Sequence, residues 1–294
     1  MSDGSAPVAA ATPEGPVAPV SRAGRNLPAA ITVGVILGAL IIGCLFWRKE
    51  LFLVLATSAI TLGVWEIVVA LRAKGVTVPL IPAVLGCVAQ LVVAFLAGAQ
   101  ALAVTFLLAV ALIVMWRGSE PVTGAAQDVA HGVLVTAYPA LLGGFAMLML
   151  AAPDGAWRTF TFVAVTVASD IGGYAVGVLA GRHPMAPSIS PKKSWEGFAG
   201  SVAFCMLVGV VCVAFSPLQG PWWAGLVLGA LLAPAATLGD LAESAIKRDL
   251  GIKDMSSFLP GHGGMMDRLD SLVVAAPVSW LVLTVLVPSA GGFG

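Results

Sequence analysis

Long apolar stretches separated by short polar breaks run through most of this chain. Nine of them approach the roughly 20 residues that a helix needs to cross a bilayer core about 30 Å thick. They span residues 28–46, 51–71, 79–98, 100–116, 132–152, 158–180, 197–215, 222–246 and 270–288. Turn-forming or charged residues fill the breaks, and the third and fourth stretches are divided only around Gly98. The pattern predicts an all-α, polytopic membrane protein with about nine transmembrane helices.

The composition agrees with this prediction. Of the 294 residues, 59% are hydrophobic and only 10% are charged, whereas a soluble globular domain carries about 25% charged residues. So few charges could not cover a surface that faces water. Most of the protein surface must therefore face membrane lipid. Lys and Arg together number 15, and so do Asp and Glu. Without a basic excess, we expect no nucleic acid as a partner.

The positive residues indicate how the chain is oriented, because cytoplasmic loops are enriched in Lys and Arg. With the N-terminus in the cytoplasm, the tail and the even-numbered loops hold twelve of the 15 Lys and Arg residues. The opposite side holds Arg48, Lys49 and Arg158. We therefore expect a multi-pass protein of the plasma membrane. Its two most polar loops, 181–196 and 247–269, would share the cytoplasmic side and carry the active site there.

The chain divides into three parts by composition. Residues 1–26 are rich in Ala, Pro, Gly and Ser without an apolar run, which predicts a disordered tail. Residues 27–156 would form the N-terminal transmembrane helices. Residues 157–294 would form the C-terminal ones and carry the catalytic site.

One helix face near the end of the eighth stretch is polar. Asp240, Glu243, Ser244 and Lys247 are spaced at i, i+3, i+4 and i+7, which places them on one side of a helix. Ionisable groups within a span usually face a cavity, a partner or an ion. The alternative is that they are interfacial residues that reach toward the headgroups. That alternative suits Lys247 and Arg248 but not the acids deeper in the span.

A glycine-rich turn precedes the last stretch. The run Gly261-His262-Gly263-Gly264 allows positive φ angles and a close approach of backbone N–H groups to an anion. Asp267 and Asp270 follow at i, i+3 and, with Asp240, suit Mg²⁺ held by carboxylates and substrate phosphates. Both acids could instead interact with the dipole of the helix that they begin.

The sixth stretch and its following loop contribute a further group. Asp170 lies in mid-span, where a carboxylate needs a reason. The glycines 173, 177 and 181 predict close helix packing. Lys192, Lys193 and Ser194 in the next loop offer donors to phosphate oxygens, although the loop could also be an ordinary positive one. We leave the role of Glu66 in the second stretch open between reaching the headgroups and pairing with Arg72.

Clustered acids, several cations and an anion-binding turn on one side of the membrane suit metal-assisted phosphoryl or nucleotidyl transfer to a lipid. The residues themselves do not identify the lipid or the nucleotide.

The run from Ser244 through Arg248, Lys253-Asp254 and Leu259 through Asp270 resembles the signature of the phosphatidate cytidylyltransferase (CDP-diacylglycerol synthase) family. Ser169-Asp170 and the stretch from Ser190 to Gly197 look like the family's second common region. The resemblance covers about residues 165–285, and the first five stretches match only in hydropathy.

The resemblance implies that CTP and phosphatidic acid react to CDP-diacylglycerol and pyrophosphate, a step of phospholipid biosynthesis. It implies Mg²⁺, with a second metal ion left open. The implied catalytic residues are Asp240, Lys247, Asp267 and Asp270. The three aspartates among them are also the implied metal ligands. The implied substrate-binding residues are Asp170, Lys192, Lys193, Ser194, Glu243, Ser244, Arg248, His262, Gly263, Gly264 and Arg268.

Two other functions stay open at this point. An ion-coupled secondary transporter would also place carboxylates in mid-span, and another lipid phosphotransferase or a polyprenol kinase would handle similar substrates. The small-residue stripe leaves a further question, because it could join helices of one chain or of a homodimer.

Overall fold

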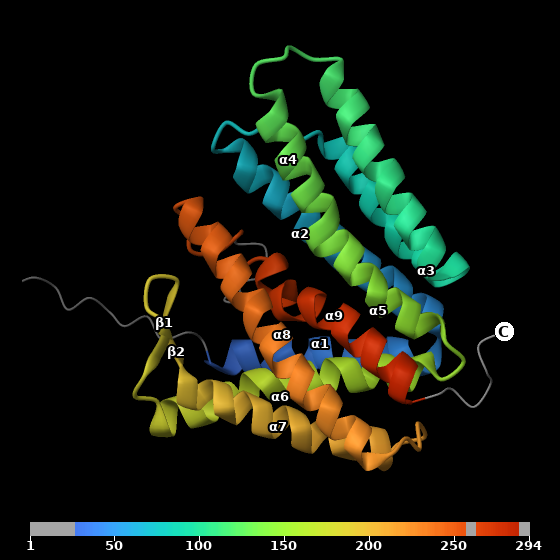
Figure 1. Cartoon of the computed structure of the whole chain (residues 1–294), viewed down its shortest axis with the longest axis vertical. Helices are drawn as coiled ribbons and strands as arrows, with labels where there is room; N and C mark the ends of the chain where they lie inside the picture. The colour runs from blue at the N-terminus through green and yellow to red at the C-terminus, as the bar shows by residue number, and fades with distance from the viewer. Residues whose placement is uncertain (1–26, 257–262, 288–294) are drawn as a thin grey trace, which may run out of the picture.

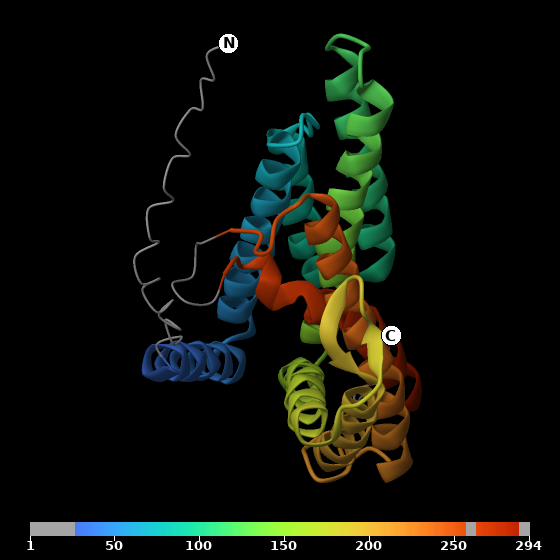
Figure 2. The same cartoon turned by 90° about the vertical axis from the view of Figure 1, so that its left-hand side faces the viewer.

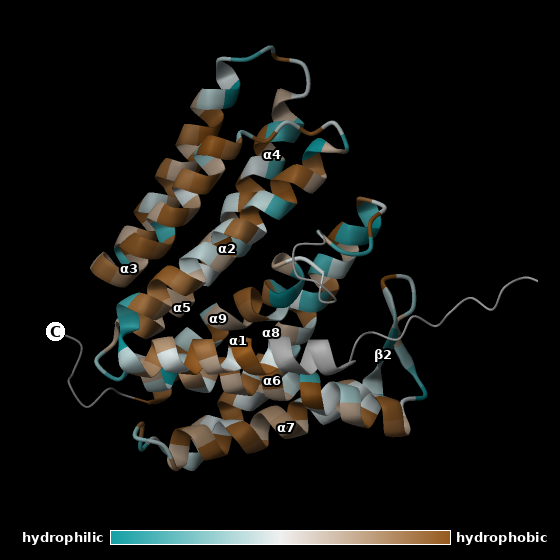
Figure 3. Ribbon diagram, turned by 180° about the vertical axis from the view of Figure 1, so that it is seen from behind, coloured by the Kyte–Doolittle hydropathy of each residue, from teal (hydrophilic) through white to brown (hydrophobic). Residues whose placement is uncertain are grey.

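The computed structural model describes residues 27–256 and 263–287. The predicted tail 1–26 and His262 therefore lie outside the described residues. Within them the chain is almost entirely helical, which confirms the all-α prediction (Figure 1). Among the residues that the structure describes, seven helical segments are long and apolar enough to cross a membrane. Hydrophobic residues run along these helices, and hydrophilic ones gather at their ends and in the connecting loops (Figure 3).

The first half of the chain forms a group of upright helices in Figure 1. It contains α2 (Lys49–Arg72), α3 (Leu80–Gly118) and a continuous rod made of α4 (Ala125–Val135), η1 (Thr136–Leu141) and α5 (Leu142–Ala151). The middle piece, η1, is a π-helical turn around Pro139, and a widened turn is a usual way to accommodate a proline inside a helix. Before this group, α1 (Leu27–Trp47) packs on α2.

The long helix α3 folds back on itself at Gly98. Its backbone there has φ 81° and ψ −168°, which is outside the helical region, and a positive φ favours glycine. A Cβ atom on Gly86 would lie 2.7 Å from the Cβ of Ala109, so the two halves of α3 pack closely together. The break that the sequence predicts near residue 98 is therefore present.

The second half of the chain forms a layered group in which α6 (Gly155–Ala180) packs on α7 (Trp195–Ala214), α7 on α8 (Trp222–Asp249) and α8 on α9 (Met266–Leu286). In Figure 1, α6 and α7 run across the direction of the upright helices, whereas α8 is inclined in a similar direction to them. α9 joins the groups because it contacts both α2 and α5.

Glycines set the close spacing within this second group. A Cβ on Gly200 would lie 2.7 Å from the carbonyl oxygen of Gly172, and one on Gly225 would lie 2.4 Å from that of Gly209. The predicted stripe takes part, because a Cβ on Gly173 would meet Ser201 Oγ at 2.6 Å. In the described structure this stripe therefore joins α6 to α7 of the same chain.

A short β-hairpin connects α6 to α7 and was not predicted. Its strands, β1 (Pro184–Ala186) and β2 (Ser190–Ser194), pair antiparallel with Pro184 opposite Ser194. The hairpin projects beside the end of α8 (Figure 2). It carries Lys192 and Lys193.

Candidate active site

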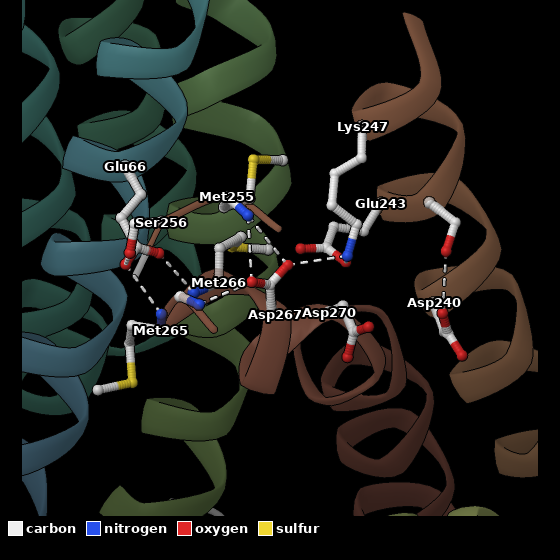
Figure 4. Close-up of polar contacts among 12 residues, drawn as sticks. Glu66, Asp240, Glu243, Lys247, Met255, Ser256, Met265, Met266, Asp267 and Asp270 are labelled. Carbon is white, nitrogen blue, oxygen red and sulfur yellow. Dashed lines mark hydrogen bonds and ion pairs between the residues drawn. The ribbon is translucent and has the colours of Figure 1, made fainter. Parts of the chain in front are cut away.

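The polar face predicted on α8 forms as expected. Ser244 Oγ donates a hydrogen bond to Asp240 Oδ1 at 3.2 Å, one turn away. Lys247 contacts the carboxylate of Glu243, whose side chain is completely buried. The ammonium of Lys247 also lies 2.8 Å from Asp267 Oδ1 on α9. The face thus joins two helices through buried charges (Figure 4).

Asp267 is bound by backbone N–H groups as well as by Lys247. Its Oδ2 accepts from Gly264 N at 2.7 Å and from Met255 N at 3.1 Å. Gly263 has φ +82°, and a Cβ there would meet Asp267 Oδ2 at 2.8 Å. The positive φ expected of this turn is therefore found at Gly263. Asp267 holds the chain on both sides of the segment 257–262, which lies outside the described residues.

Glu66 of α2 reaches the same turn from the first half of the chain. Its side chain is 1% exposed, and it accepts from Ser256 Oγ at 2.5 Å, from Met265 N at 2.9 Å and from Met266 N at 2.8 Å. Figure 4 shows Glu66 and Asp267 on either side of these backbone groups. Neither of the roles weighed from the sequence includes this contact, since the partners lie 190 or more residues away.

A cavity of about 280 Å³ lies beside the face of α8. Residues of α6, the hairpin, α7, α8 and α9 line it. The polar residues on its wall include Asp170, Lys192, Lys193, Ser194, Asp240 and Ser271. Lys193 Nζ lies 2.5 Å from Asp240 Oδ2 and so connects the hairpin to α8. A cavity with both charges and apolar walls suits a substrate that has a phosphate and a lipid part.

Glu196 holds the hairpin in place over this cavity. Its Oε2 accepts from the backbone N–H groups of Arg182 at 3.0 Å and His183 at 3.2 Å, and its Oε1 lies 2.5 Å from His183 Nδ1. Ser194 Oγ accepts from Gly197 N at 3.1 Å, which caps α7. The cap gives Ser194 a structural role at the edge of the cavity. Because Ser194 is the last residue of β2, the cap also fixes the end of the strand that carries the two lysines.

The predicted residues therefore gather in two adjoining groups. The first group consists of Glu243, Lys247, Gly263, Gly264 and Asp267. The second group lines the cavity and consists of Asp170, Lys192, Lys193, Ser194 and Asp240. Asp270 lies between Asp267 and Asp240 in Figure 4. Arg248 and Arg268 are exposed residues of α8 and α9.

Asp170 of α6 and Asp240 of α8 line the cavity, and Asp270 of α9 lies between Asp267 and Asp240 in Figure 4. Acids gathered in one region repel one another unless a cation intervenes. These oxygens are the donors that Mg²⁺ prefers, so the donor chemistry fits this ion. Within residues 27–256 and 263–287, however, no three acidic, His or Cys side chains stand at metal-ligand spacing. Metal binding by Asp240, Asp267 and Asp270 stays a prediction.

The comparisons with known proteins extend over nearly the whole chain. The sequence profile of the cytidylyltransferase family matches residues 28–286. The phosphatidate cytidylyltransferase of Mycobacterium leprae is 40% identical over 281 residues, which is 90% of each chain. That of Mycobacterium bovis is 39% identical over 284 residues, or 92% of each chain, and that of Synechocystis is 42% identical over 138 residues, or 46% of each.

These matches also include the first five apolar stretches, in which the motifs alone had given no resemblance beyond hydropathy. The similarity is therefore a property of the whole membrane fold and is not limited to the signature near its C-terminal end. This chain belongs to the phosphatidate cytidylyltransferase family.

Proposed function

We propose that the protein transfers the cytidylyl group of CTP to phosphatidic acid and so makes CDP-diacylglycerol and pyrophosphate. The observation that carries the proposal is the 40% identity, over 90% of the chain, to a protein named phosphatidate cytidylyltransferase. Family membership disfavours a secondary transporter and a polyprenol kinase, the alternatives raised by the sequence.

The charges in the two groups suit this reaction. An oxygen of the phosphatidate phosphate attacks the α-phosphorus of CTP, a new P–O bond forms, and the bond to the β-phosphate breaks as pyrophosphate leaves. Lys193 at the cavity and Lys247 beside it would hold phosphate oxygens and offset their charge. The attacking phosphate is already an anion, so this step does not require a strong general base.

We propose Mg²⁺ as the cofactor, held by Asp240 and Asp270 with Asp267 as the further ligand expected from the sequence. A divalent cation would neutralise charge on the nucleotide phosphates. The neighbouring Asp170 supports a cation at the cavity, because it adds a third carboxylate to Asp240 and Asp270. Lys193 contacts Asp240 and Lys247 contacts Asp267, so each lysine partly offsets the negative charge of its partner.

We further propose nine membrane crossings with the N-terminus and the active site in the cytoplasm. Counting the halves of α3 separately and adding α1 to the seven long apolar segments gives nine. Contacts between loops support the assignment of sides. Lys49 donates to the carbonyl oxygens of Ala152 and Pro153, and all of these residues belong to the predicted outer side. Glu66 and Ser256 meet near the predicted inner side.

The proposed division at residue 156 needs one qualification. Every predicted site residue falls in the part 157–294, but Glu66 from the first part holds the glycine-rich turn. The first part therefore contributes to the shape of the site, because neither part alone contains all of these contacts.

The decisive experiment supplies the purified, detergent-solubilised protein with phosphatidic acid, Mg²⁺ and CTP labelled at either the α- or the γ-phosphate. We expect α-label in a CDP-lipid and γ-label in pyrophosphate. ATP and UTP in place of CTP test the choice of base. If neither label followed this pattern while the protein remained monodisperse, the proposed function would be wrong.

A further inference from the structure

A buried carboxylate from the first half of the chain is aimed at the turn that begins α9. Glu66 is 1% exposed and accepts from the backbone N–H groups of Met265 and Met266, at 2.9 and 2.8 Å. The first N–H groups of a helix have no partner within the helix. Met265, at the N-cap of α9, has no side chain that could cap it. Glu66 supplies this cap from another helix.

Glu66 and Asp267 each bind the chain at two places, residues 255–256 and residues 264–265. Asp267 accepts from Met255 N and Gly264 N, and Glu66 accepts from Ser256 Oγ and from Met265 N. The two carboxylates thus bind neighbouring residues before and after the segment 257–262. Because Asp267 also binds Lys247, a shift of this backbone would move the carboxylate and its ion pair together.

The contact is also close enough to depend on a glycine. A Cβ on Gly264 would lie 2.8 Å from Glu66 Oε2 and 3.0 Å from Ser256 N. The backbone of the turn can approach the carboxylate only because Gly264 has no side chain. Burying a carboxylate within a span is costly and usually indicates function.

We propose that Glu66 is a positioning residue for the cytidylyl transfer, in that it fixes the backbone that presents Asp267 to Lys247. This inference rests on the proposed function. Glu66 itself would touch neither CTP nor phosphatidic acid. Loss of an outer-shell residue that orients a metal ligand typically costs about 10- to 100-fold in activity, and Asp267 is the proposed ligand here.

The test measures kcat and both KM values of Glu66→Gln per folded protein, with Glu66→Asp as the conservative variant. Gln presents an NH₂ group to a backbone N–H, whereas Asp keeps the carboxylate. We expect kcat to fall about 10- to 100-fold in E66Q, both KM values to stay within about twofold of the unsubstituted protein, and E66D to recover part of kcat. A kcat of E66Q equal to that of the unsubstituted protein would overturn the proposal.

Asp128→Asn is the matched control for a purely structural loss. Asp128 is also a buried carboxylate, which accepts from Thr77 N at 2.7 Å and pairs with Arg117 at 2.7 Å, but it belongs to α4. D128N should lower the unfolding temperature and leave kcat per folded molecule unchanged. An equal fall of kcat in D128N would show that Glu66 acts only through the general stability of the fold, and would refute a positioning role.

Ser256→Ala keeps the proposal testable if E66Q does not fold. It removes the hydroxyl bond to Glu66 and should lower kcat with unchanged KM values, while an unaltered kcat would count against the proposal. Absence of any CDP-lipid from the unsubstituted protein is a different result, because it rejects the proposed function itself.

Discussion

The ammonium of Lys247 on α8 lies 2.8 Å from Oδ1 of Asp267 on α9, and the same ammonium contacts Glu243. One cation therefore stands between two acids whose side chains are 6% and 0% exposed. Loss of the cation alone would leave two buried acids without their partner, which is costly. The arrangement places a phosphate-binding candidate and a metal-binding candidate in direct contact.

The first prediction concerns Asp267. We expect Asp267→Asn to reduce kcat by at least about 100-fold, the loss typical of removing one preorganised electrostatic contact at a reacting centre. The amide keeps one oxygen acceptor, so the protein should still insert and fold. The measurement is CDP-lipid formation at saturating Mg²⁺, with monodispersity checked by size exclusion. Asp249→Asn, an exposed acid at the end of α8, is the matched control and should retain activity.

The second prediction separates the two roles of Lys247. Lys247→Ala should weaken nucleotide binding and also destabilise the fold by about 3–5 kcal/mol, because it leaves two acids without their cation. The added change Glu243→Gln removes one of these charges. The double variant should therefore regain much of the unfolding temperature without regaining the KM for CTP. Equal KM values in K247A and the unsubstituted protein would remove Lys247 from the substrate site.

The third prediction tests the glycine contacts that bring α6 and α7 together. A Cβ on Gly200 would lie 2.5 Å from Val176 Cγ2 and 2.7 Å from the carbonyl oxygen of Gly172. Gly200→Ala should therefore destabilise the protein by about 1–3 kcal/mol, as overpacking does.

Gly38→Ala on α1 is the control for this change, because a Cβ at Gly38 would meet nothing within 4 Å. It should leave the unfolding temperature unchanged or raise it slightly, since alanine restricts the unfolded chain more than glycine. Thermal unfolding in detergent compares the two variants, and an equal loss in both would show that the close approach at Gly200 has no special importance.

The helices could be predicted because a bilayer imposes a length and a polarity on each crossing. The predicted stretch 51–71 corresponds to α2, Lys49–Arg72, and the predicted break near residue 98 is the turn inside α3. The face of α8 could be predicted for a similar reason, as the spacing of Asp240, Ser244 and Lys247 depends only on helix geometry.

The contacts that complete the site could not be predicted in this way. Glu66 finds its partners about 190 to 200 residues further along the chain, and no local spacing encodes such a contact. The hairpin escaped prediction because the strand Ser190–Ser194, with the sequence SPKKS, is short and polar and lacks the apolar alternation that marks a strand. The lysines of the hairpin are placed at the cavity through the contacts of Glu196 with the backbone of Arg182 and His183, which become visible only in the structure.

The last prediction concerns the metal, and it follows from the carboxylates at the border of the cavity. We expect turnover to cease when a chelator removes divalent cations and to return when Mg²⁺ is added. Asp240 contacts Lys193 and is one of the charges that act on Asp270. Asp240→Asn should therefore raise the Mg²⁺ concentration for half-maximal rate about 10- to 100-fold.

The same titration distinguishes a metal ligand from a residue that binds substrate. Lys193→Ala removes the cation beside Asp240 and leaves the carboxylate more available to Mg²⁺. It should therefore leave the Mg²⁺ requirement unchanged or lower it, while raising the KM of a phosphate-bearing substrate. A higher Mg²⁺ requirement in K193A and an unaltered one in D240N would contradict the metal assignment, because the loss of a carboxylate and the loss of a cation must act on a bound cation in opposite directions.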